Sequence, residues 1–118
     1  MDIYVDGSCS RIAYIIDDTA PMICPLKTKR TNNEGEYLAV LIALTALITA
    51  GFYDGTDIEI YSDSQLIVNQ LNGKYKIHKP ELQDLHDKVM DLSGSISSKV
   101  KVTWVPRELN KAGWLLEG

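Results

Sequence analysis

Three carboxylates stand where a single site could use all of them. Asp6 and Asp63 each end an alternating, strand-like segment, and Glu36 lies in the first turn of a predicted helix. Ligands of α/β sheets gather outside the carboxyl ends of the strands, so neighbouring parallel strands would bring both aspartates to one edge. Oxygen ligands without His or Cys suit Mg²⁺ or Mn²⁺ rather than zinc. Two such ions, about 3.5–4 Å apart, can support in-line phosphoryl transfer.

Each carboxylate also has an ordinary structural interpretation. Asp6 precedes a glycine, as turn residues often do. Asp63 could be the N-cap of a following helix, and Glu36 could simply complement a helix dipole. Taken singly, each residue fits these interpretations better, but the joint pattern favours a shared site.

Composition excludes several classes of protein. The chain of 118 residues predicts one domain, 1–118, and 45% hydrophobic with 24% charged residues is ordinary for a globular protein. A net charge of −4 argues against a general polyanion binder. The longest apolar run, Leu38–Leu44, is too short for a membrane helix, and the acidic start is no signal peptide, so we expect a cytoplasmic protein. Cys9 and Cys24 fit buried thiols rather than a disulfide framework.

The elements that must position the carboxylates follow from periodicity. Alternation predicts strands over Asp2–Asp6, Arg11–Asp17, Ala20–Lys27, Asp57–Tyr61 and Lys99–Val105. Capping signals and helical spacing predict helices over Glu34–Ala50, Ser64–Asn72, from Pro80 onward, and over Leu109–Glu117. The order βββαβααβα predicts an α/β fold, a five-stranded mixed sheet with helices packed on it. The first three strands would be antiparallel and the later ones parallel.

Four segments carry a family resemblance. VDGSC, TNNEGEY, YSDSQ and WVPRELN resemble the motifs of ribonuclease H type 1 (ribonuclease HI), in its order and spacing, over essentially the whole chain. The resemblance implies the ribonuclease H-like fold and endonucleolytic cleavage of the RNA strand of RNA–DNA hybrids, giving 5′-phosphate and 3′-hydroxyl ends. It also implies two divalent ions, Mg²⁺ or Mn²⁺, held by four acidic residues. Three of these carry over as Asp6, Glu36 and Asp63, with Asp6 bridging both ions.

The fourth ligand departs from the family pattern N-x-x-A-D. Here Asn110 is followed by Lys-Ala-Gly-Trp, and Glu117 is the only later carboxylate. We therefore predict Asn110 as a neutral catalytic and metal ligand through its amide oxygen, so that Asn110→Asp should improve metal binding. The alternative is that Asn110 is the N-cap of the last helix. The family's loop histidine is also missing, and Arg107 and Glu108 stand near its place.

The resemblance also points to residues that would contact the substrate. Asn32, Asn33 and Gln65 match groove-contacting positions, and their amides both donate and accept, which suits a 2′-hydroxyl. Ser8 and Cys9 would offer backbone contacts to RNA. Thr31 matches a position that binds a phosphate of the DNA strand, although Thr31 to Asn33 could equally be plain helix capping.

Two other functions stay open. Without a fourth acid the chain could be a weakly active or inactive hybrid-binding module. It could also be a nuclease of the same superfamily with a different nucleic-acid substrate, because a fold does not decide its substrate. The basic loop Lys74–Lys79 would either touch phosphates or be a solvated turn. We expect a monomer that binds an RNA–DNA hybrid, with no membrane and no protein partner.

Overall fold

The computed structural model of the protein describes residues 1–51, 55–96 and 98–117. The strands are β1 (Asp2–Gly7), β2 (Arg11–Ile16), β3 (Met22–Pro25), β4 (Ile58–Ser62) and β5 (Val100–Trp104). The helices are α1 (Asn32–Thr49), α2 (Gln65–Leu71), α3 (Pro80–Ser95) and α4 (Lys111–Glu117), with a short 3-10 helix at Arg107–Leu109. This order along the chain confirms the predicted βββαβααβα plan.

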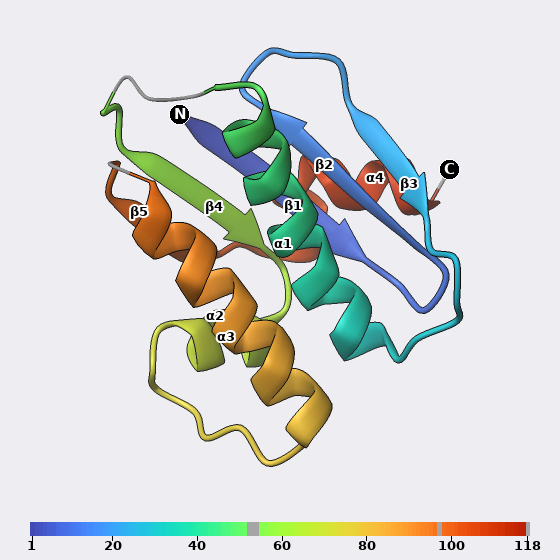
Figure 1. The fold of residues 1–118 in the computed structure, drawn as a ribbon. Helices are drawn as coiled ribbons and strands as arrows, with labels where there is room; N and C mark the ends of the chain where they lie inside the picture. Colours follow the sequence, from blue (N-terminus) through green and yellow to red (C-terminus); the bar gives the residue numbers. More distant parts are fainter. Residues whose placement is uncertain (52–54, 97, 118) are drawn as a thin grey trace.

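The strands form one mixed sheet in the order β3-β2-β1-β4-β5. β1 pairs antiparallel with β2 and parallel with β4, and β4 pairs parallel with β5. Figure 1 shows α1 and α3 side by side over one face of the sheet, with α4 behind the opposite face. Because β1 and β4 run in parallel as neighbours, their carboxyl ends meet at one edge of the sheet.

Helix α1 is set by its capping box and by its buried face. The Thr31 hydroxyl accepts from the backbone N–H of Glu34, and the Glu34 carboxylate accepts from the N–H of Thr31, at 3.1 Å each. The apolar residues of α1 pack against β1, β2 and α3. They belong to one core, whose fully buried members include Ile3, Val5, Tyr37, Val40, Leu44, Ile58 and Ile60. The core therefore fixes the first turn of α1 beside the end of β1.

Two predicted elements differ in extent. β3 covers only Met22–Pro25 of the expected Ala20–Lys27, because Pro21 precedes the strand and Pro25 ends it, and proline has no N–H for a ladder hydrogen bond. The expected last helix, Leu109–Glu117, is broken at Asn110, whose backbone is extended with φ −86° and ψ 101°. Within the part of the chain that the structure describes, no helix is long and apolar enough to cross a membrane.

Candidate active site

The end of β1 and the start of α1 touch through backbone atoms. A Cβ atom added to Gly7 would lie 2.1 Å from the carbonyl oxygen of Gly35, and one added to Gly35 would lie 1.9 Å from the carbonyl oxygen of Ser8. Only glycine permits this approach at either position. As a result the Gly7 N–H donates to Oε1 of Glu36 at 2.6 Å, which places the Glu36 carboxylate beside Asp6.

Three carboxylates converge at this edge of the sheet. Asp6 comes from β1, Glu36 from α1, and Asp63 from the loop after β4, and one oxygen of each lies within 4.8 Å of the others. The ordinary interpretation of Asp63 as a helix cap is wrong, because the hydroxyl of Ser64 caps α2 by accepting from the Ile67 N–H at 3.3 Å. The structure thus brings together the three acids that the sequence singled out.

Burial and mutual repulsion govern the electrostatics of the cluster. Asp6 is 3% exposed and Glu36 is 9% exposed. Burial, followed by the neighbouring Asp6 charge, raises the pKa of Glu36 to about 9. The pKa of Asp6 is also raised, mainly by burial, and a hydrogen bond with Glu36 opposes part of that rise. The metal-free pair therefore holds a proton at neutral pH. A close, oxygen-only donor set of this kind fits a hard divalent cation such as Mg²⁺ or Mn²⁺.

Asn110 lies at the site but presents its nitrogen to it. The side chain is fully buried, and its Nδ2 donates to the Val5 carbonyl at 2.9 Å and to Oδ2 of Asp63 at 3.1 Å. Its Oδ1 accepts from the N–H of Ala112 at 3.2 Å, as an N-cap of α4 does. In this arrangement the amide oxygen caps the helix while a donor faces the carboxylates, which fits the alternative of an N-cap; the ligand role of the oxygen stays a prediction.

Arg107 lies next to Asp63 of the acidic cluster, and Glu117 pairs with this arginine. Nη1 of Arg107 lies 3.6 Å from Oδ2 of Asp63, and its Nε donates to Oε1 of Glu117 at 2.6 Å. Glu117, the carboxylate that follows Asn110 in the sequence, therefore pairs with Arg107 rather than joining the acidic cluster. The sequence placed Arg107 near the site but assigned it no contact.

A surface groove extends from the carboxylates. It is lined by backbone and side chains of Asp6, Gly7, Ser8, Cys9, Ser10, Arg11, Asn32, Asn33, Glu36, Arg107 and Leu116. Four of the predicted substrate-contacting residues, Ser8, Cys9, Asn32 and Asn33, thus lie on this groove. Thr31 is occupied in the capping box, and Gln65 is exposed at the start of α2, so neither lines it.

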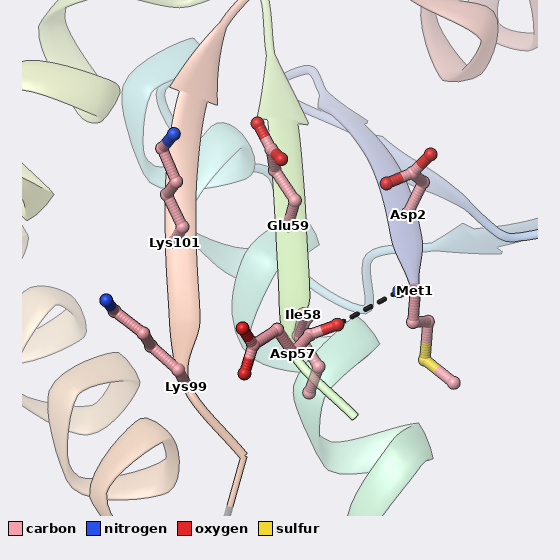
Figure 2. A pocket seen from close by; sticks show the side chains of 7 residues that line it. All are labelled: Met1, Asp2, Asp57, Ile58, Glu59, Lys99 and Lys101. Carbon is pink, nitrogen blue, oxygen red and sulfur yellow. Dashed lines mark hydrogen bonds between the residues drawn. The ribbon is translucent and has the colours of Figure 1, made fainter. Parts of the chain in front are cut away.

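A second hollow lies at the opposite end of the parallel strands. Figure 2 shows the acidic side chains of Asp57 and Glu59, before and on β4, beside the basic side chains of Lys99 and Lys101, before and on β5, with Glu59 opposite Lys101 in the strand register. The amino group of Met1 donates to the Asp57 carbonyl at 2.9 Å. Opposite charges on paired strands stabilise the sheet itself. The carboxylate edge is therefore the candidate site.

Known proteins resemble this chain in sequence and in fold. A family model described as reverse transcriptase-like matches residues 9–115. Ribonuclease HI of Halobacterium salinarum is 35% identical over 83 residues, which are 70% of this chain and 40% of that protein. A bifunctional protein of Mycobacterium tuberculosis is 29% identical over 82 residues, 70% of this chain and 21% of that protein. The chain thus matches less than half the length of these relatives.

A solved structure extends the likeness to three dimensions. The crystal structure of LC11-RNase H1 in complex with an RNA/DNA hybrid superposes with a TM-score of 0.85 at 27% identity, covering 93% of this chain and 88% of that one. The family match over residues 9–115, the shared fold and the four ordered motifs lead to one assignment. The chain belongs to the reverse transcriptase-like family and, within it, to the ribonuclease H type 1 proteins.

Proposed function

We propose that the chain is a ribonuclease H, an endonuclease that hydrolyses the RNA strand of RNA–DNA hybrids with two bound divalent ions. The observation that carries this proposal is the convergence of Asp6, Glu36 and Asp63 within 4.8 Å at the carboxyl ends of β1 and β4. Divalent ions held there would lower the pKa of an attacking water and stabilise the leaving 3′-oxygen.

The chain's own residues hold the three carboxylates in place. The Gly7 N–H fixes one oxygen of Glu36, and the Asn110 amide fixes one oxygen of Asp63. These donors restrict the rotation of both side chains before a ligand arrives, as supporting hydrogen bonds around metal ligands do. Asp6 comes from the central strand β1, and an oxygen of it lies within 4.8 Å of one from each of the other two acids, which favours it as the shared ligand.

The groove suits a strand that carries 2′-hydroxyls. Asn32 and Asn33 form the first turn of α1 and line the groove next to Glu36. An amide both donates and accepts, and the hydroxyl of a ribose does the same. The N-terminus of an α-helix also attracts phosphate. A hybrid seated here would present its RNA strand to the carboxylates, and the solved relative in complex with an RNA/DNA hybrid supports this substrate class.

The test is cleavage of labelled, sequence-matched duplexes. Hybrid, duplex RNA and duplex DNA are incubated with the protein in Mg²⁺, in Mn²⁺ and in EDTA. We expect cutting of the RNA strand of the hybrid alone, with 5′-phosphate ends and only when metal is present. Comparable cutting of duplex DNA would contradict the substrate assignment.

Two variants separate the site from the rest of the chain. Asp63→Asn removes a metal-facing charge and should abolish cleavage without loss of fold. Asp91→Asn removes the same charge from the exposed side of α3 and should leave cleavage unchanged. If the parent protein binds the hybrid but never cuts it with either metal, the chain is a binding module, and the nuclease proposal fails.

A further inference from the structure

Gly113 lies against the carboxylate cluster on the side of α4. It is buried in the first turn of that helix. A Cβ atom added to it would lie 3.5 Å from Oδ2 of Asp6 and 3.5 Å from Oδ2 of Asp63, with the Cβ of Asn110 next at 3.8 Å. All three are ordinary van der Waals distances, so a Cβ atom at residue 113 would touch both aspartates without a clash.

This glycine differs from the other two glycines of the site. Added Cβ atoms at Gly7 and Gly35 would overlap backbone oxygens, so close chain contact requires glycine at both positions. No such contact requires it at Gly113. Its backbone is helical, where glycine is unfavourable relative to alanine. Close packing at the Cβ position therefore does not explain the glycine, and residue 113 presents no side chain to Asp6 and Asp63.

The residues next to Gly113 do not supply an acidic ligand beside Asp6 and Asp63. The oxygen of Asn110 caps Ala112, and its nitrogen donates towards Asp63. Arg107 lies on the same side of Asp63 and brings a positive charge. Glu36 reaches the cluster from α1, on the opposite face of the sheet. The cluster thus has all its acidic ligands on the side of α1 and the strand ends, and none from α4.

We propose that residue 113 sets the metal loading of this site, and that glycine there leaves the centre one carboxylate short on the α4 side. Three carboxylates then bind one divalent cation, and a second cation binds only weakly beside Asp63. The inference shares with the proposed function only the premise that the carboxylates bind a divalent cation.

The test counts bound Mn²⁺ on the protein alone. Free Mn²⁺ is measured by its electron paramagnetic resonance signal during titration of the parent, Gly113→Asp and Gly113→Asn. Asparagine has the shape of aspartate without the charge, so the pair isolates the added carboxylate. We expect Gly113→Asp to bind Mn²⁺ about tenfold more tightly than Gly113→Asn, or to bind one further equivalent. The asparagine variant should match the parent within about twofold.

A second readout guards against loss of fold. Metal-free Gly113→Asp should melt below Gly113→Asn, because it adds a fourth negative charge to the cluster, and Mn²⁺ should reverse that order. If metal-free Gly113→Asp does not fold, Gly113→Glu and Gly113→Gln replace the pair, since the longer side chain lets the charge move away from the aspartates.

The outcomes distinguish this inference from the proposed function. If the parent binds Mn²⁺ and the aspartate and asparagine variants give the same titration curve, residue 113 does not set metal loading, while the nuclease proposal stands. If the aspartate variant binds more Mn²⁺ but no variant cleaves a hybrid, the inference stands and the nuclease proposal fails. If no variant binds Mn²⁺, both are overturned.

Discussion

Raising the pH should destabilise the metal-free protein through one buried side chain. Glu36 is 9% exposed and lies against Asp6, and burial with that neighbouring charge raises its pKa from 4.5 to about 9. Between these two values the folded chain holds a proton that the unfolded chain has released. The stabilisation is therefore complete below pH 4.5 and is lost as the pH rises through about 9.

The size of the effect follows from proton linkage. One extra proton in the folded state lowers the free energy of unfolding by about 1.4 kcal/mol for each pH unit. From pH 6 to pH 8 the metal-free protein should lose about 3 kcal/mol. Unfolding entropy of about 2.1 cal/mol/K per residue makes each kcal/mol worth about 4 °C for 118 residues. The melting temperature should then fall by about 11 °C.

Thermal unfolding followed by circular dichroism in EDTA measures this effect. Glu36→Gln keeps an oxygen for the Gly7 N–H but cannot titrate. The melting temperature of this variant should therefore fall much less than that of the parent between pH 6 and pH 8. Titrating groups away from the acidic cluster are common to both proteins and cancel in the comparison, and the titration of Asp6 changes together with that of Glu36 because the two are hydrogen-bonded. Saturating Mn²⁺ should flatten the parent's curve, because a bound cation favours the ionised carboxylate. Equal pH slopes for the parent and Glu36→Gln in EDTA would refute the reasoning.

Three substitutions test the supports of the site by urea unfolding. Asn110→Asp should destabilise the metal-free protein by about 3 kcal/mol or more, because it places a buried charge against the Val5 carbonyl and Asp63. Unchanged stability would favour a role of the Asn110 amide oxygen as a metal ligand instead. Gly35→Ala should lower stability by about 2 kcal/mol through overpacking against a backbone oxygen, and a stabilised variant would contradict that contact. Tyr37→Phe should lower it by about 1–2 kcal/mol, since the buried oxygen of Gln70 loses its 2.7 Å donor, and a neutral result would argue against that bond.

The acidic cluster was predictable from the sequence because its signals are local. Asp6 and Asp63 follow alternating strands, and the capping box from Thr31 to Glu34 fixes where the helix carrying Glu36 begins. Given these positions, the parallel pairing of β1 with β4 is enough to bring the acids to one edge of the sheet. The same local reasoning gave Asp63 an alternative role as a cap, which Ser64 holds instead.

The orientation of Asn110 was not predictable in this way. Its amide is turned by the carbonyl of Val5, 105 residues earlier in the chain, and by the N–H of Ala112. A donor and an acceptor therefore reach the side chain from opposite sides, and only one orientation satisfies both. The neighbourhood of Gly113 is likewise a tertiary property. A motif pattern that counts residues from Asn110 places the fourth position at Trp114, which is exposed.

The negative charges of the acidic cluster are partly offset by groups of the chain itself. A proton shared by Glu36 and Asp6 offsets one charge, and the Arg107 guanidinium beside Asp63 offsets part of another. The Gly7 N–H and the Asn110 amide supply hydrogen bonds to oxygens that would otherwise be buried without partners. Asp6, Glu36 and Asp63 would hold a divalent cation, whose positive charge would favour the ionised form of Glu36 in place of the proton. A carboxylate at residue 113 would add a further negative charge next to Asp6 and Asp63, so we expect it to stabilise the site only when a cation is bound.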